Sequence, residues 1–287
     1  DATALVALAG KVATADAKAF ASVTTITEAG LTVGTDGATV VSALNIAGND
    51  AAVNIINDTI SAVSLDAIAN ATSGVVTATI TAGTASDFTA LSDTTVAQAV
   101  VNALTLKITD DFATTTELIA LDAATSVTVN ASAIKDISGA VADLKTIYAS
   151  KTISGLGNEA VTITDSASAD AVNAILKATT GIVTTTLTVT AADAETLNKD
   201  LKDAKGTDAL ILTVTGAANA ADLVALDGKT SVDVIVSAVG PVDGTFAELN
   251  KVYVTNKDNF TGLGNEAVTI NGTVTAAQAN TIANATT

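Results

Sequence analysis

Apolar and polar residues alternate along several short runs of the chain. In one run, Leu210, Leu212 and Val214 occupy every second position, and Thr213 and Thr215 are the polar residues that follow. Strict alternation over four to eight residues is typical of a strand with one buried and one exposed face, because successive side chains of a strand point to opposite sides. The pattern therefore predicts a series of short, half-buried strands.

Between these runs, alanine and larger aliphatic residues recur at three- and four-residue spacing. Ala171 and Ile175 are one such pair, and this spacing indicates an amphipathic helix. Asp165, Ser168 and Thr190 are the expected helix starts, because their side-chain oxygens can accept hydrogen bonds from free amides. Strands that alternate with helices imply parallel pairing with helical crossovers. In the clearest stretch the expected strands are 161–164, 185–190, 210–215 and 232–237, and the expected helices are 168–177, 191–204, 218–226 and 244–253.

The alternation also predicts how the layers are arranged. A parallel sheet covered on both faces should read as nearly continuous apolar runs, whereas these strands alternate with a period of two. We therefore expect helices on one face of the sheet and an open polar face on the other, with Leu187, Val189, Val232 and Val234 among the inward residues. The predicted open surface, here called the threonine face, comprises Thr105, Thr109, Thr128, Thr162, Thr164, Thr186, Thr188, Thr213 and Thr215.

A long internal repeat organises the sequence. The segment from Gly155 to Ile163 recurs unchanged from Gly262 to Ile270, so the numbering offset between the two copies is 107 (262 − 155). Each long repeat divides into four β-α units of about 27 residues (107/4), within the range of solenoid periods. The predicted fold is an α/β, repetitive β-α solenoid similar to leucine-rich repeats, although their Leu-x-x-Leu-x-Leu signature is absent. The expected division is a partial repeat over 1–50, a first repeat over 51–157, a second over 158–264 and the start of a third over 265–287.

Composition narrows the chemistry that the chain can perform. Its 287 residues carry a net charge of −17 and include no Cys, Met, Trp or His. Thiol catalysis and the usual histidine triads are therefore excluded, and the negative charge argues against nucleic acid, which is bound through cationic contacts to phosphate. No apolar run reaches the roughly 20 residues that span a bilayer. The acidic doublet Asp110-Asp111 is interpreted as a solvated loop, so we expect neither an enzyme nor an organic cofactor.

Calcium is the one cofactor that the composition leaves open. This cation prefers oxygen ligands, and the acidic loop residues that could supply them are Asp58, Glu159, Asp165, Asp243 and Glu266. The alternative is that these carboxylates only keep an acidic surface soluble. The Gly-Gly-x-Gly-x-Asp repeat of calcium-binding nonapeptides is absent from the chain. Both interpretations stay open from the sequence alone.

The repeated segments resemble those of a known group of proteins. The run from Gly155 to Asp165, and the later Ala169-Asp170-Ala171 with Thr179-Thr180-Gly181, are similar to repeats in very large secreted surface proteins of marine bacteria, cyanobacteria among them. The resemblance covers nearly the whole chain. It implies a surface-layer (S-layer), adhesin-like or filament component that is secreted to the cell surface or the extracellular space.

Two functions from different classes follow. The first is a non-enzymatic structural repeat module of an extracellular surface layer, sheath or filament, which assembles with copies of itself through open solenoid ends or edges into a polymer or lattice. Because both termini fall inside a repeat, a segment of a longer protein is expected. The second is an adhesin-type stalk or binding module, in which the threonine face engages glycan, ice or another protein. Neither function requires nucleic acid or insertion into a membrane.

Overall fold

The computed structural model describes residues 25–29, 52–60, 62, 65, 69, 73–92 and 101–286. They fall into two compact units. Unit 1 contains the residues up to 134 together with 149–156, and unit 2 contains 135–148 together with the residues from 157 onward. Most of the predicted partial repeat over 1–50 lies outside the described residues, and so does the side chain of Asp58.

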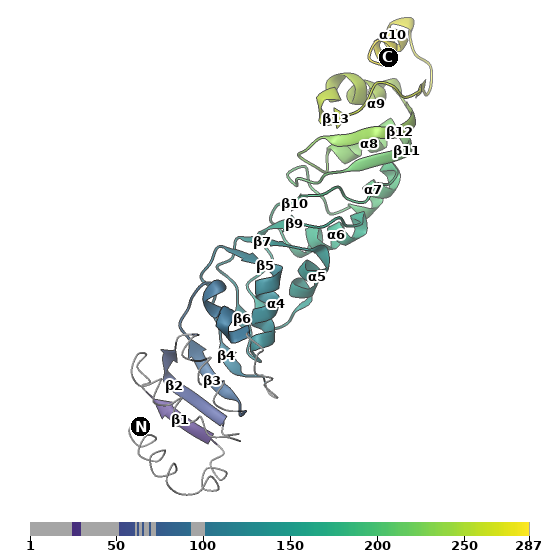
Figure 1. The fold of residues 1–287 in the computed structure, drawn as a ribbon. Helices are drawn as coiled ribbons and strands as arrows, with labels where there is room; N and C mark the ends of the chain where they lie inside the picture. Colours follow the sequence, from purple (N-terminus) through teal and green to yellow (C-terminus); the bar gives the residue numbers. More distant parts are fainter. Residues whose placement is uncertain are drawn as a thin grey trace, which may run out of the picture. The chain divides into compact units, whose positions relative to one another are not determined.

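Unit 1 contains a four-stranded sheet whose strands lie side by side in sequence order (Figure 1). The strands are β1 (Thr25–Ala29), β2 (Ala52–Ile60), β3 (Val76–Ile80) and β4 (Ala103–Thr105), and each registered pair is parallel. A 3-10 helix, η2 (Ser86–Ser92), follows β3. The other elements that the structure describes in full in this unit are β5 (Phe112–Thr114), α4 (Thr115–Ala124), and the parallel pair β6 (Val129–Asn130) and β8 (Ile153–Ser154).

Unit 2 repeats the alternation of strands and helices. In its first sheet, β9 (Ala160–Ile163) lies between β7 (Asp136–Gly139) and β10 (Val183–Thr185). In its second sheet, β12 (Val234–Gly244) pairs with β11 (Thr213–Asn219), β13 (Phe260–Thr261) and β14 (Val268–Ile270). All of these pairs are parallel. The helices are α5 (Val141–Ala149), α6 (Ala169–Ala178), α7 (Ala194–Asp200), α8 (Ala220–Asp227), α9 (Phe246–Asn250) and α10 (Ala276–Ala283), with a π-helical turn η3 (Lys251–Thr255) and a 3-10 turn η4 (Lys257–Asn259).

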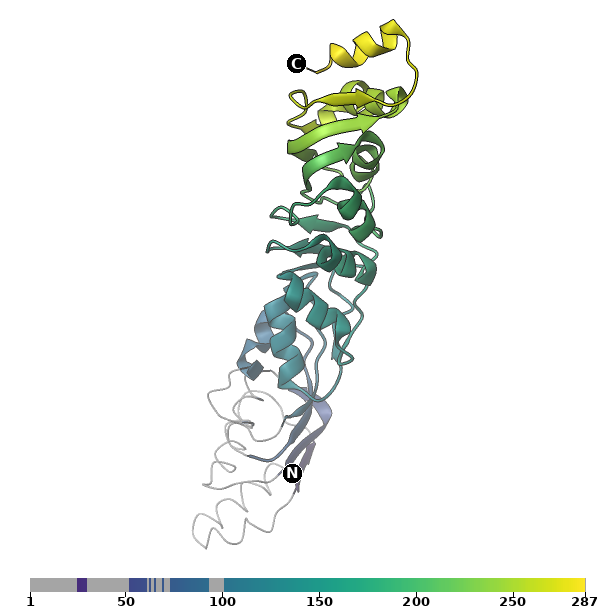
Figure 2. The ribbon, with the colours of Figure 1, turned by 90° about the vertical axis from the view of Figure 1, so that its right-hand side faces the viewer.

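Helices and strands pack against each other within unit 2. The helices α6, α7 and α8 contact one another in order, and α8 also packs on β11 and β12 (Figure 2). On the buried side of α6, Val172, Ile175 and Leu176 are nearly inaccessible to solvent. The predicted mixed α/β fold with parallel sheets and helices is therefore confirmed.

The strands show the predicted alternation of burial. In β3, Val76, Ala78 and Ile80 are buried, whereas Thr77 and Thr79 are exposed. Burial of small and branched aliphatic side chains at about 25 cal/mol per Å² is the main source of stability available to a chain with 2% aromatic residues. The core consequently consists almost entirely of Val, Ile, Leu and Ala.

Two residues predicted to face inward lie on the surface instead. Leu187 is 50% exposed and Val232 is 39% exposed. Both fall outside the strands to which the sequence pattern assigned them, because β10 already ends at Thr185 and β12 begins only at Val234. Alternation fixes the direction of a side chain only while the backbone is an extended strand.

The predicted helix starts are partly confirmed. The hydroxyl of Ser168 accepts a hydrogen bond from the amide of Ala171 at 3.3 Å, and α6 follows it as expected. In contrast, α7 does not begin after Thr190. It begins after Asp193, whose carboxylate accepts from the amide of Thr196 at 2.8 Å. Aspartate is among the strongest N-cap residues and outranks threonine.

Candidate functional site

The repeated Gly-Leu-Gly-Asn-Glu segment forms a turn in which the glutamate is held from several sides. Glu159 is 1% exposed and accepts hydrogen bonds from the amides of Gly157 at 2.7 Å and Asn158 at 3.0 Å. The hydroxyl of Tyr148 donates to the same carboxylate. Because two backbone amides and a phenol all donate to this buried carboxylate, Glu159 is a structural anchor of this turn.

The second copy of the segment makes the same arrangement. Glu266 accepts from the amides of Gly264 at 3.0 Å and Asn265 at 3.1 Å, and the hydroxyl of Tyr253 donates to it. Tyr148 and Tyr253 are the two tyrosines of the chain. Burial, followed by the hydrogen bond to the neighbouring glutamate, raises the pKa of both phenols far above the ordinary value. The sequence showed that the glutamates recur, but the tyrosines lie 11 and 13 residues before them in the chain, and no pattern linked the two.

Buried threonines connect successive β-α units. Thr179 is 3% exposed; its hydroxyl donates to the carbonyl of Glu159 at 2.6 Å and accepts from the amide of Gly181 at 3.0 Å. Thr230 makes a similar set of hydrogen bonds. Its hydroxyl donates to the carbonyl of Leu210 at 2.9 Å and accepts from the Leu210 amide at 3.0 Å. These hydroxyls satisfy backbone groups where a strand begins, so they replace bonds that a longer strand would supply.

A steric constraint explains why glycine occupies the last position of the Thr-Thr-Gly segment. A Cβ atom at Gly181 would lie 2.2 Å from the carbonyl oxygen of Glu159, closer than any real contact. Glycine is therefore the residue that lets these two backbone segments approach.

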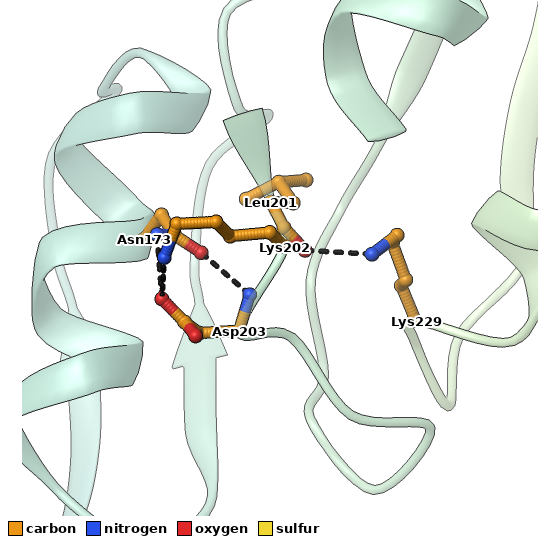
Figure 3. Close-up of polar contacts among 5 residues, drawn as sticks. All are labelled: Asn173, Leu201, Lys202, Asp203 and Lys229. Carbon is orange, nitrogen blue, oxygen red and sulfur yellow. Dashed lines mark hydrogen bonds and ion pairs between the residues drawn. The ribbon is translucent and has the colours of Figure 1, made fainter. Parts of the chain in front are cut away.

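A further polar cluster links α6 to the segment after α7. The side chain of Asn173 donates to Asp203 Oδ2 at 2.9 Å and accepts from the Asp203 amide at 2.9 Å. Lys202 Nζ forms an ion pair with the same carboxylate at 2.5 Å, and Lys229 Nζ donates to the carbonyl of Leu201 at 2.8 Å (Figure 3). Partial burial lowers the pKa of the Lys229 ammonium. The hydrogen bond from Lys202, and then that from Asn173, hold the pKa of Asp203 below its ordinary value.

Four of the five calcium candidates have described side chains, and each of the four is engaged by protein donors. Besides Glu159 and Glu266, Asp165 accepts from the amide of Val141 at 2.8 Å, and Asp243 accepts from the side-chain amide of Asn271 at 2.8 Å. Within the described ranges, no group of three or more acidic, His or Cys side chains is arranged to hold a metal ion. The four carboxylates therefore act in this structure as acceptors for backbone and side-chain donors.

The threonine face is solvent-accessible at every predicted position. Thr105, Thr109 and Thr128 belong to unit 1, and the other members belong to unit 2; all are exposed or half-buried. One of the hydroxyls is already used, because Thr186 donates to the carbonyl of Ile163 at 3.1 Å.

A shallow depression in unit 1 contains the acidic doublet. Its lining includes Asp110, Asp111 and Glu117, together with Thr84, Ser86 and Phe112. Asp110 accepts from the amide of Ala85 at 2.7 Å, and Glu117 accepts from the amide of Thr114 at 2.8 Å as part of a capping box. These two carboxylates stabilise a turn and a helix start.

Comparison with protein-family models, with curated proteins and with solved structures found no match to this chain. Among the described residues, no helix has both the length and the hydropathy that a membrane-crossing helix requires.

Proposed function

We propose that the chain is a non-enzymatic structural module, a β-α solenoid that assembles with copies of itself into an extracellular layer, sheath or filament. The observation that carries this proposal is the use of polar side chains to connect one β-α unit to the next. Thr179, Thr230, Asn173 and Glu159 each bridge residues that are far apart in sequence and contiguous in the fold. Repeat proteins gain their stability from such contacts between neighbours.

The spacing of the strand pairs supports the solenoid. Val161 pairs with Val183, and Val242 pairs with Val268, so the residue numbers of the partners differ by 22 (183 − 161) and by 26 (268 − 242). Parallel partners at nearly constant separation are what a coil of strand–helix units requires, since each turn places its strand beside the previous one. Helices that pack on the inner side of the strands would leave the threonine face open.

Equivalent contacts in the two units support the long repeat. The amide of Val76 donates to the side chain of Asn102 at 2.9 Å, and the amide of Val183 donates to that of Asp208 at 2.9 Å. The numbers of Val76 and Val183 differ by 107 (183 − 76), which is the offset found in the sequence. Thr125 also donates to the carbonyl of Leu104 as Thr230 does to that of Leu210, at offsets of 105 (230 − 125) and 106 (210 − 104).

Electron microscopy of the purified chain, once with calcium and once with a chelator, tests the proposal. We expect filaments or sheets in both conditions, because protein donors already occupy the described carboxylates. Loss of the assemblies on chelation would support assembly with calcium at the joints. Single particles in both conditions would overturn self-assembly and favour the stalk or binding module.

The accessibility of the threonine face supports a second function, that of an adhesin-type stalk or binding module. Thr164 is exposed and Thr213 is half-buried, and both belong to unit 2. An adhesin-type module would use them to bind glycan, ice or protein. Screening the chain against immobilised glycans, with Thr164→Val and Thr213→Val as variants, checks this: a glycan that binds the parent and not the variants would establish it.

A further inference from the structure

The edge of unit 2 at which α6, α7, α8 and α9 begin carries acidic residues and no lysine. In a coil of parallel strands, the helices run opposite to the strands, so α6, α7, α8 and α9 all begin at the same edge. Acidic residues lie in their first turns, at their N-caps and in the segments that lead to them, where the helix dipole favours negative charge. No lysine occurs in residues 164–176, 186–198, 213–226 or 237–248. The acidic edge comprises Asp165, Asp170, Asp193, Glu195, Asp222, Asp243 and Glu248.

The opposite edge, where these helices end and the strands begin, carries lysines. Lys229 is half-buried, and the remaining lysines of this edge are exposed. Aspartates occur here as well: Asp208 is 1% exposed, Asp203 pairs with Lys202, and Asp227 accepts from the side chains of Asn256 and Asn259. Asp200 is half-buried, whereas Asp233 and Asp258 are exposed, so this edge is rich in exposed lysines but is not purely positive. The lysine edge comprises Lys177, Lys199, Lys202, Lys205, Lys229 and Lys251.

Exposed apolar side chains lie among these lysines. Ile182 is 50% exposed, Val254 is 41% exposed and Val232 is 39% exposed. Ile182 follows α6, Val232 follows Lys229, and Val254 lies in η3, so all three belong to the lysine edge. A contact between two copies at this edge would remove these side chains from water, which is favourable for apolar surface. Helix capping alone explains acidic residues at helix starts, but it does not explain these apolar residues.

The two edges are too far apart to neutralise each other within one copy. A helix of the length of α6, ten residues, spans about 15 Å, whereas the Debye length at physiological ionic strength is about 8 Å. Both charge series follow the same strands, which lie about 4.8 Å apart. The lysine edge of one copy therefore has the same pitch as the acidic edge of another.

We propose that unit 2 binds a second copy of this chain edge to edge, with the lysine edge of one copy against the acidic edge of the next. The contact joins two different surfaces and so can continue from copy to copy into a sheet or filament. This inference rests on the proposed function and names the surface through which the copies associate.

Ionic strength provides the first test, by analytical ultracentrifugation of the purified chain. The net charge of −17 makes copies repel at long range, and this repulsion reaches about 30 Å at 0.01 M salt but about 8 Å at 0.15 M. Salt near 1 M screens contacts beyond about 3 Å and weakens the edge pairs themselves. We expect association to be strongest at intermediate salt. Association that only increases up to 1 M salt would indicate an apolar contact and overturn the proposal.

Charge reversal provides the decisive test. The double variant Lys177→Glu with Lys199→Glu makes both edges acidic, and Asp170→Lys with Glu195→Lys reverses part of the acidic edge. We expect each variant alone to associate about tenfold or more weakly than the parent, and an equal mixture of the two to associate again. Both variants keep a net negative charge, so recovery on mixing requires the matched edges.

A control separates the edge from net charge alone. Lys107→Glu with Lys145→Glu changes the charge by the same amount at two exposed lysines outside the lysine edge, and we expect it to associate like the parent. Equal loss in this control, or no loss in either edge variant, would overturn the edge-to-edge contact.

If the parent forms assemblies that the edge variants leave unchanged, the proposed function stands and only this surface is wrong. If the parent forms none at any salt concentration, the proposed function fails as well. Circular dichroism checks that each variant is folded.

Discussion

Asn173 and Asp203 exchange two hydrogen bonds in opposite directions, each of 2.9 Å, across 30 residues of sequence. Asn173 projects from the buried side of α6, where it is 6% exposed, and Asp203 lies in the segment after α7. An amide among Val172, Ile175 and Leu176 is stable only because both of its polar atoms are bonded. The pair therefore fixes the position of one β-α unit against the next.

Replacing Asn173 by Ala should destabilise the fold by about 1–3 kcal/mol, because the Asp203 amide loses its acceptor in a partly buried site. Urea unfolding monitored by circular dichroism measures the change. Asp203→Asn is the matched control, since it keeps an acceptor for the Asn173 amide group and should change stability much less. Equal stability of Asn173→Ala and the parent would show that the pair contributes nothing.

The pKa of Asp203 predicts a pH dependence. The bond from Lys202, and then that from Asn173, lower this pKa below the ordinary value of 3.8. A carboxylate with a depressed pKa in the folded state contributes stability that is fully present above the unfolded pKa and is lost as the pH falls through the folded pKa. The stability difference between the parent and Asp203→Asn should thus begin to shrink as the pH falls below about 4, and it should be lost once the pH is below the folded-state pKa of Asp203. A difference that stays constant from neutral pH through the acid range would contradict this assignment.

The two tyrosines provide a readout of folding in alkali. Burial, then the hydrogen bonds to Glu159 and Glu266, raise the pKa of Tyr148 and Tyr253 well above 10.0. The protonated phenols contribute stability that is present below the unfolded pKa of about 10 and is lost as the pH rises beyond it. In native protein, the ultraviolet absorbance of ionised tyrosine should not appear near pH 10, whereas it should appear there in urea. Identical titrations of native and unfolded chain would refute the buried Tyr–Glu contacts.

The hydroxyl of Thr230 should matter more than its methyl group. Thr230→Val keeps the shape of the side chain but leaves the amide and carbonyl of Leu210 without their partner, which should cost about 1–3 kcal/mol. Thr230→Ser keeps the hydroxyl and should lose less. At the exposed Thr164, the same change to Val should stay within about 0.5 kcal/mol. Urea midpoints for the three variants measure these differences.

Much of the fold could be predicted from local patterns. The expected strand 161–164 and helix 168–177 agree closely with β9 (Ala160–Ile163) and α6 (Ala169–Ala178). The expected strand 185–190 agrees less well with the structure, since the observed strand β10 covers Val183–Thr185. Alternation marks which residues are half-buried, but the point at which a strand ends depends on partners in the neighbouring strand, which a single segment does not encode.

The connecting residues could not be predicted in the same way. Thr179 and Thr230 look like ordinary strand-forming or helix-ending threonines, and Asn173 looks like a polar residue on a helix surface. Their roles depend on groups 20 to 30 residues away. Such bonds follow from how the turns stack, so only the three-dimensional arrangement reveals them. The recurrence of Glu159 at Glu266 was visible, but its meaning required the tyrosines.

Gly262 and Gly272 allow a test that separates backbone strain from steric fit. Gly262 and Gly272 both have positive φ angles, of 99° and 94°. A Cβ atom at Gly262 would lie 2.7 Å from Ser237, whereas one at Gly272 would meet nothing within 4 Å. Both alanine variants carry the cost of a left-handed backbone, roughly 1–2 kcal/mol. Gly262→Ala should cost a further 1–3 kcal/mol, approximately, because Ser237 must move to make room. Urea unfolding of the two variants in parallel measures the difference between them. Equal losses would mean that strain alone requires these glycines, and that the close approach of Gly262 to Ser237 is not needed for the turn.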